Sequence, residues 1–212
     1  MWMRSIVTVV AVVALLTSCG VGTTSDTAAG ARSSGPGADS TGPLAEPEPS
    51  SAELCPDSLP RASKATYGFG DDGPAATAPS LPVPHRAWIC RYDPRDIATR
   101  ADAAWFEWVR QGRPRPLDDT ELATFSSAVE GLRPASADRA CTADLGPRYL
   151  VAYAEGSELT GVVVDAYGCG DIRLTDDPSA TVPGEPRRPG TVAGVLQGPV
   201  GFLGALDAGR GG

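Results

Sequence analysis

Apolar residues are distributed in three distinct ways along the chain. They form a nearly unbroken run over residues 6–16, interrupted only by Thr8, and then almost vanish, with Leu44 the one large apolar residue between Val21 and Ser51. From about residue 53 they recur at the spacings of strands and helices. The pattern predicts a signal peptide over 1–18, a disordered tether rich in Gly, Ser, Thr and Pro over 19–52, and one folded domain over 53–212.

The first apolar run ends at a lipobox, the site at which a bacterial lipoprotein is acylated on cysteine. Its sequence is Leu16-Thr17-Ser18-Cys19, and a short basic start with Arg4 precedes the run. The run matches the ~7–15 residues of a signal-peptide core and is shorter than the ~20 residues of a membrane-spanning helix. We therefore predict lipidation of Cys19, which anchors the protein in the lipid bilayer at the extracytoplasmic face of the cell membrane. The alternative is an ordinary secretory signal with a chance cysteine.

Alternation of apolar and polar positions predicts the first strand of the domain. Residues 85–92 place Trp88, Cys90 and Tyr92 on one face, and Asp93-Pro94 predicts a turn after them.

A second, aromatic-rich segment over 105–110 fits a strand. A helix over 96–109 also fits the apolar spacing, and this alternative stays open. In either case the Arg-Pro repeat over 113–116 is expected to end the element.

The clearest helix runs from Asp119 to about Leu132. Asp118 is placed to cap its first turn, and Glu121 three residues later completes a capping box. Leu117 and Leu122 stand where a hydrophobic staple needs them. The apolar stripe of this helix is expected to be buried against a sheet, and it consists of Leu122, Phe125, Val129 and Leu132.

Three later segments predict an antiparallel arrangement. Residues 148–154 and 161–167 form a hairpin, and residues 171–175 return as a third strand. Residues 182–190 are rich in Pro and Arg and predict irregular structure, while 199–206 fit a short terminal helix. The fold class that follows is α+β, an antiparallel sheet with one long amphipathic helix packed on it.

With Cys19 assigned to the lipid, the remaining cysteines form an even set, which in an extracytoplasmic domain predicts two disulfides. They are Cys55, Cys90, Cys141 and Cys169, and no pair has the spacing of a zinc or redox motif. Four cysteines allow three pairings. The hairpin brings Cys141 next to Cys169, so we favour that pair together with Cys55–Cys90.

The order of these features resembles a group of uncharacterised actinobacterial secreted proteins and lipoproteins with a four-cysteine domain. The residues that carry the resemblance are Cys55-Pro56, Leu59-Pro60, Cys90-Arg91-Tyr92, Cys141, Tyr149-Leu150-Val151 and Gly168-Cys169. It covers roughly residues 55–175. No activity is established for the group, so the resemblance implies a location and a fold type and assigns no functional residues.

Charge and composition exclude several functions. The formal net charge of −8 argues against nucleic acid as a partner, because phosphate binding needs a basic surface. Lys64 is the only lysine, and no Walker-type phosphate loop is present. His85 is the only histidine, so we interpret it as a surface or structural residue rather than part of a catalytic triad or a histidine metal site.

The acidic pairs and the tryptophans are the remaining candidates for chemistry. Asp118-Asp119 is explained by helix capping, and the other pairs, Asp71-Asp72 and Asp176-Asp177, lie in turn-forming segments where a weak calcium site is the alternative. The tryptophans that could line a binding face or fill the core are Trp88, Trp105 and Trp108. We expect no cofactor and no resident metal.

Three functions compete at this point. We favour a membrane-anchored, non-enzymatic binding or interaction module whose partner is an unknown protein or envelope ligand. The second is an enzyme acting on envelope material. The third is a protease-inhibitor-like domain, suggested by the segment Cys90-Arg91-Tyr92-Asp93-Pro94, which resembles a reactive loop beside a disulfide.

Overall fold

The computed structural model describes residues 50–62, 69–97, 106–142, 144–199 and 201–207. The predicted signal peptide, the lipidation site Cys19 and most of the predicted tether lie outside the described residues, as do Trp105 and the C-terminal tail. The statements that follow concern the described part of the chain.

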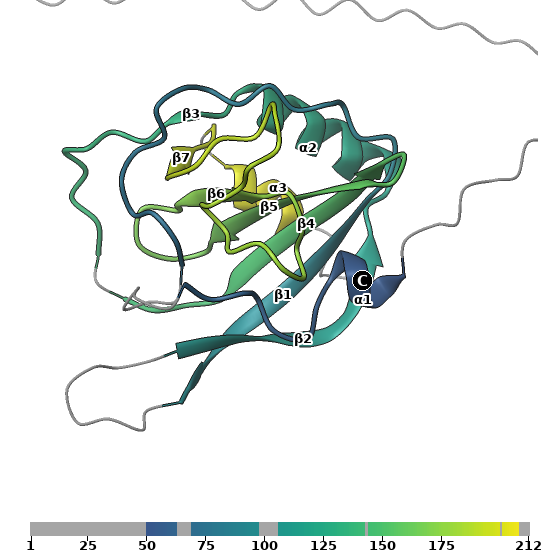
Figure 1. Cartoon of the computed structure of the whole chain (residues 1–212), viewed down its shortest axis with the longest axis horizontal. Coiled ribbons are helices and arrows are strands. Elements are labelled where there is room, and N and C mark those ends of the chain that lie inside the picture. Colours follow the sequence, from purple (N-terminus) through teal and green to yellow (C-terminus); the bar gives the residue numbers. More distant parts are fainter. Residues whose placement is uncertain (1–49, 63–68, 98–105, 143, 200, 208–212) are drawn as a thin grey trace, which may run out of the picture. The chain divides into compact units, whose positions relative to one another are not determined.

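A seven-stranded sheet organises the domain, in the order β2-β1-β4-β5-β6-β7-β3 with all neighbours antiparallel (Figure 1). Its strands are β1 (Ala87–Asp96), β2 (Phe106–Pro116), β3 (Arg133–Pro134), β4 (Arg148–Glu155), β5 (Glu158–Asp165), β6 (Ile172–Thr175) and β7 (Leu196–Gln197). The helices are α1 (Ser51–Leu54), α2 (Asp119–Glu130) and α3 (Phe202–Asp207). The antiparallel sheet with accompanying helices is therefore confirmed. The structure does not show one long helix alone: α2, with 12 residues, is the longest helix described, and two short ones accompany it.

The sheet is covered on both faces. On one face Phe125 and Val129 of α2 and Phe202 of α3 pack against Val162 and Leu174, which we call the helix-side core. On the other face the segment before β1 packs on the strands and forms a second cluster, which we call the disulfide-side core. Its members are Leu54, Cys55, Leu59, Phe69, Cys90, Tyr92, Trp108, Leu150, Ala152 and Val163. The central strands β4 and β5 are consequently buried at six of their eight positions each, and their middle residues are mostly apolar, as expected for strands covered on both faces.

Strands β1 and β2 are longer than the sequence predicts. Asp93-Pro94 continues β1 instead of turning, so the expected turn is wrong, whereas the Arg-Pro repeat over 113–116 forms the last four residues of β2, which ends at Pro116. The helix alternative over 96–109 is also wrong where it is described, since residues 106–109 are in β2. Proline is tolerated here for a physical reason. Beyond Tyr92, β1 pairs only with β2, and β2 is an edge strand of the sheet, which is the setting in which strands accept proline.

Helix α2 begins as predicted and ends slightly earlier. The Asp118 carboxylate accepts a hydrogen bond from the Glu121 N–H, and the Glu121 carboxylate accepts one from the Asp118 N–H, which completes the capping box. The helix ends at Glu130 and is followed by Gly131, so Leu132 is buried just beyond it.

The hairpin and both favoured disulfides are present. Gly156 and Ser157 form the two-residue connection between β4 and β5, with Gly156 at a φ of 58° that suits glycine. Cys55–Cys90 and Cys141–Cys169 are joined, with Cα atoms 6.2 and 5.0 Å apart.

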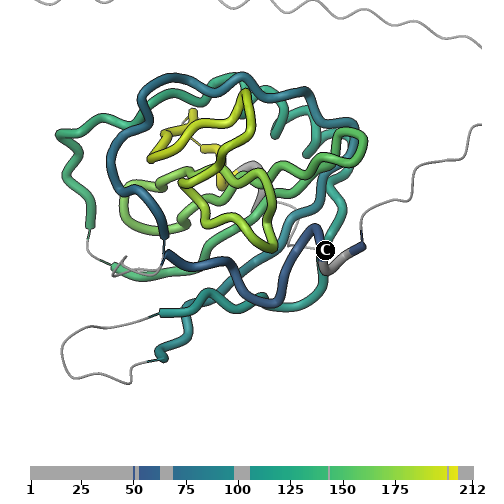
Figure 2. The backbone as a smooth tube through the Cα atoms, in the orientation of Figure 1, coloured from purple at the N-terminus to yellow at the C-terminus, as the bar shows by residue number. Residues whose placement is uncertain are grey.

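A long segment without helix or strand wraps the fold between Phe69 and β1. Figure 2 shows its path from the start of the described segment at residue 69 around the domain into β1. Backbone hydrogen bonds tie it to the Pro-rich C-terminal part, from Gly70 to Pro183 and from Ser80 to Gly190. This tie places Phe69 and Asp72 beside β6, where they contribute to the site described next.

Candidate functional site

The described residues enclose a pocket of about 340 Å³ at the ends of the central strands, next to the Cys141–Cys169 disulfide. Its floor comes from β4, β5 and β6, and its rim comes from the segments before β4 and after β5. The residues that line it are Phe69, Asp72, Cys141, Thr142, Asp144, Leu145, Arg148, Asp165, Tyr167, Gly168, Cys169, Asp171 and Arg173.

Sheet register brings three charged residues together at the floor. Arg148 is the cross-strand partner of Asp165, and Arg173 pairs with Val163, two residues from Asp165 and therefore on the same face. Asp165 bridges the two arginines. Its Oδ1 accepts from Arg148 Nε at 2.6 Å, and its Oδ2 accepts from Arg173 Nη1 at 3.3 Å. The side chains of Arg148, Asp165 and Arg173 are only 3, 8 and 6 % exposed.

Aromatic rings hold Arg148 from more than one side. Its Cζ lies 3.5 Å from the ring centroid of Phe69 and 3.8 Å from that of Trp108. Trp108 in turn stacks on Tyr167, with centroids 5.8 Å apart and an interplanar angle of 8°. A desolvated guanidinium over aromatic faces gains about 2 kcal/mol, so these rings offset part of the cost of burying it.

Burial and pairing act in opposite directions on the ionisation of the floor. Burial raises the pKa of the Asp165 carboxyl, while Arg148 and Arg173 oppose this rise. Burial also lowers the pKa of the Arg148 guanidinium and raises that of the Tyr167 hydroxyl. The floor is thus a buried ionic cluster whose geometry is fixed by strands rather than by loops.

The rim carries carboxylates of different exposure. Asp72 is 75 % exposed and its Oδ1 lies 3.0 Å from Arg173 Nη2. Asp171 pairs with Arg139, with 2.7 Å between Nη1 and Oδ1. Asp144 accepts hydrogen bonds from the Thr142 hydroxyl and the Gly168 N–H, and the hydroxyl contact lowers the pKa of the Asp144 carboxyl.

Of the acidic pairs singled out in the sequence, only Asp71-Asp72 reaches this pocket, through Asp72. Asp118 caps α2 as expected. Asp176 accepts from the N–H groups of Arg187 and Arg188, and Asp177 accepts from those of Ser179 and Ala180, so both serve turns. Within the described residues no group of three or more His, Cys, Asp or Glu side chains could hold a metal ion.

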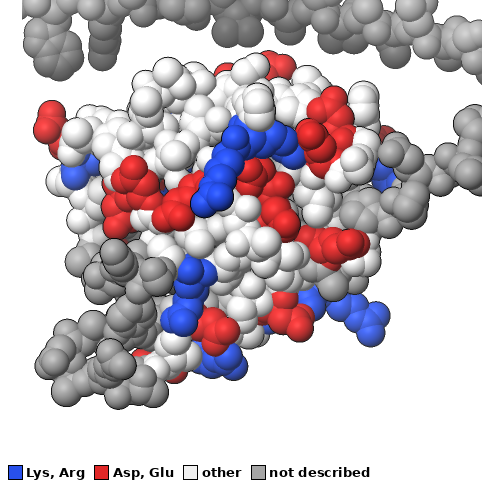
Figure 3. Space-filling model, in the orientation of Figure 1, with Lys and Arg blue, Asp and Glu red and all other residues white. Residues whose placement is uncertain are grey.

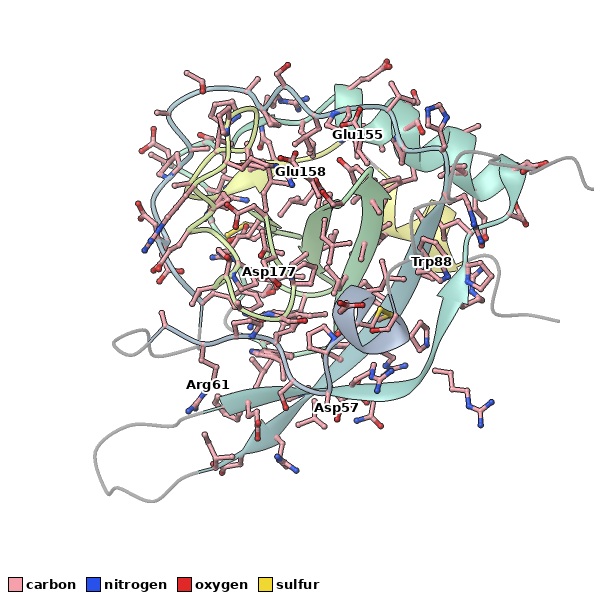
Figure 4. All side chains as sticks on the ribbon, turned by 45° about the vertical axis from the view of Figure 1, so that its right-hand side comes forward. Asp57, Arg61, Trp88, Glu155, Glu158 and Asp177 are labelled. Carbon is pink, nitrogen blue, oxygen red and sulfur yellow. A yellow bond between two sulfur atoms is a disulfide. The ribbon has the colours of Figure 1, made fainter. Side chains whose placement is uncertain are left out.

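A second, shallower depression lies at the turn of the hairpin. It is lined by Glu158, Asp176, Asp177 and Arg188 together with Ser157 and Leu159. Figure 4 shows Glu155 and Glu158 where β4 meets β5. Arg188 is committed there to the Leu159 carbonyl and the Thr160 hydroxyl. On the face shown in Figure 3, acidic side chains border the basic ones, and no broad basic area is present.

The other predicted candidates take structural positions. His85 is exposed and does not line the pocket. Trp108 is fully buried in the disulfide-side core, and Trp88 packs partly against that core while Arg86 lies over its ring. The segment Cys90 to Pro94 lies inside β1, where it pairs with β4 up to Tyr92 and with β2 beyond it, so it does not form the exposed loop that protease inhibition would require.

Sequence reasoning missed the floor of the pocket. The available signal is a charged residue bordering each buried apolar run, Arg148 before 149–153 and Asp165 after 162–164. If the predicted strands 148–154 and 161–167 are paired over their full length, Arg148 lies opposite Tyr167 instead of Asp165. The observed turn of two residues shifts this register by two, which keeps the faces and changes the partners.

None of the helices described between residues 50 and 207 has the length and apolar character of a membrane span. Comparison of the chain with protein-family models, with curated proteins and with solved structures found no match.

Proposed function

We propose that the protein is a lipid-anchored extracytoplasmic lipoprotein whose domain is a non-enzymatic binding module, with the pocket beside Cys141–Cys169 as its binding site. The observation that carries this proposal is the preformed floor of Arg148, Asp165 and Arg173. Three charged side chains held on strands at the base of a concave site are typical of ligand recognition.

The lining favours binding over covalent catalysis. Among its described residues there is no histidine, lysine or serine, and its two cysteines are joined to each other. Neither a Ser–His nor a Cys–His pair is therefore among the described lining residues, and the hydroxyl that lies beside a carboxylate is that of Thr142 next to Asp144.

The anchoring part of the proposal rests on the sequence. Acylation of Cys19 and a tether over 19–52 would display the domain at the outer face of the membrane, and this is also where two disulfides are stable. We expect the full chain to fractionate with membranes and to incorporate a labelled fatty acid. Cys19→Ser should abolish both, and unchanged labelling in that variant would contradict the lipobox assignment.

The binding site is tested with the full-length protein in detergent. The protein is incubated with a low-molecular-mass fraction of the cell envelope, and retained mass is measured by native mass spectrometry. Thr142→Trp places a large side chain at the exposed rim, while Thr120→Trp places the same side chain on the exposed start of α2 as a control. We expect retention by the wild type and by Thr120→Trp, and loss in Thr142→Trp. No retained mass in the wild type, or equal retention in Thr142→Trp, contradicts the assignment.

An enzyme acting on envelope material is the second candidate, and one observation favours it. Asp165 is a buried carboxyl with a raised pKa that lines the pocket, which is the pattern of a general acid. Hydrolysis of envelope glycans or peptides by the wild type that is lost in Asp165→Asn, with the fold retained by circular dichroism, would favour this function over simple binding.

A further inference from the structure

The charges on the floor of the pocket are already neutralised. Asp165 is shared by Arg148 at 2.6 Å and Arg173 at 3.3 Å, and Asp171 is 2.7 Å from Arg139. An anionic ligand would have to displace these carboxylates from the arginines. Breaking a buried ion pair costs about 3–5 kcal/mol, so the floor is poorly suited to capture an anion.

The mouth of the pocket, in contrast, carries negative charge in excess of its partners. Asp144 forms no ion pair with any arginine in the described part of the chain, and its acceptor contacts are a hydroxyl and a backbone N–H. Asp72 has one contact with Arg173 and is 75 % exposed. A cation arriving at the mouth therefore meets two carboxylates with unused oxygen lone pairs.

A buried donor gives a second, independent indication. Arg173 lines the pocket and is 6 % exposed, and its Nε has no hydrogen-bond partner among the described residues. Buried donors in native proteins almost always have an acceptor. The ligand is therefore expected to carry an oxygen acceptor in addition to its positive charge. Leu145 and Tyr167 supply apolar wall between these polar groups.

From these observations we infer that the pocket takes a small organic cation, an ammonium or guanidinium compound that also bears oxygen acceptors, with its positive group between Asp72 and Asp144. This inference rests on the proposed function, because it names the ligand class of the same pocket. Amino sugars and basic amino acids belong to this class. Attraction between charges at a wet rim is screened by salt, so the affinity falls as ionic strength rises.

The experiment uses matched probes that differ in charge. Glucosamine is compared with N-acetylglucosamine, and Nα-acetylarginine amide with Nα-acetylcitrulline amide, by titration into the isotopically labelled full-length protein in detergent. The reporters are the Gly168 amide, which donates to Asp144, and the amide of Tyr167. We expect each cation to shift these signals and to bind about tenfold more tightly than its neutral partner, a ratio that corresponds to roughly 1.4 kcal/mol.

Asp144→Asn removes the charge and keeps the oxygen that accepts from the Gly168 N–H. We expect it to weaken binding of both cations by about fivefold, the size of an exposed charge pair of ~1 kcal/mol. Glu130→Gln removes one negative charge at the exposed end of α2 and should leave binding unchanged.

Three results would overturn the inference. They are equal affinity of a neutral probe and its cation, equal affinity of Asp144→Asn and wild type, and no shift with either cation at ~10 mM, where millimolar binding is detected. Neutral probes that shift the same signals with the same affinity as the cations would refute the preference for positive charge while leaving the pocket as a binding site. The proposed binding site itself is tested separately, by the envelope-fraction experiment with Thr142→Trp.

Discussion

The most informative single substitution is Arg148→Met, which removes the guanidinium from the floor of the pocket and keeps an unbranched side chain of similar reach. Two kinds of contact are lost. One is the 2.6 Å ion pair with Asp165, and the other is the position over Phe69 and Trp108 at 3.5 and 3.8 Å.

The expected cost follows from burial. Removing one partner of a buried ion pair typically costs about 3–5 kcal/mol, because the remaining charge is left without compensation. Arg173 still lies 3.3 Å from Asp165, which places our expectation at the lower end. The loss of the aromatic contacts adds to this cost, by up to about 2 kcal/mol. We therefore expect the free energy of unfolding to fall by about 3–4 kcal/mol.

The assay is equilibrium unfolding of the oxidised protein in urea, followed by tryptophan fluorescence and analysed with a common m value. Arg95→Met is the matched control, since it makes the same change in an exposed β1–β2 pair, where Arg95 is 60 % exposed beside Glu107. Exposed pairs contribute at most about 1 kcal/mol. If Arg148→Met and Arg95→Met destabilise the protein equally, the buried cluster does not hold the pocket floor in place.

Three further predictions concern other parts of the fold. In Gly161→Ala the new Cβ would lie 2.6 Å from Thr175 Cγ2, so thermal unfolding should show a loss of about 1–3 kcal/mol, whereas Gly204→Ala, with open space around it, should show none. Limited dithiothreitol followed by alkylation and mass spectrometry should label Cys141 and Cys169 before Cys55 and Cys90, because Cys55 and Cys90 are 0 and 2 % exposed while Cys141 is exposed; the reverse order would contradict this account. The hydrogen bond from Arg115 lowers the pKa of Glu121 below its ordinary 4.5. The stability that the ionised Glu121 contributes is therefore present above pH 4.5 and is lost as the pH falls through the lowered pKa. Glu121→Gln should accordingly flatten the acid limb of stability against pH, and an unchanged limb would show that this pair contributes nothing.

Local signals in the sequence were sufficient for much of the fold. The capping box at Asp118 and Glu121 fixes the start of α2, because it satisfies orphan backbone donors through neighbours in the chain. The turn between β4 and β5 is equally local, and it places Cys141 beside Cys169. These predictions depend on contacts over a few residues or across one hairpin.

The pocket depends on contacts that no local pattern records. Phe69 and Trp108 meet over Arg148 only because the segment after residue 69 is tied to the C-terminal part and because β2 pairs with β1. Asp93-Pro94 indicated a turn because the tolerance of a proline beside an edge strand is a property of the assembled sheet. The residue types predicted buried aromatic side chains, but only the tertiary structure shows that they surround Arg148.

The buried Cys55–Cys90 bridge has a mechanical consequence. It joins the segment that follows α1 to β1, a strand hydrogen-bonded to β2 and β4. A pull on the chain before Ser50 therefore reaches an interior strand of the sheet through a covalent link. There the load is shared by the hydrogen bonds that β1 makes with β2 and with β4. The N-terminal layer cannot peel away under tension while the bridge is intact, so the domain is built to bear load at the end where the chain enters it.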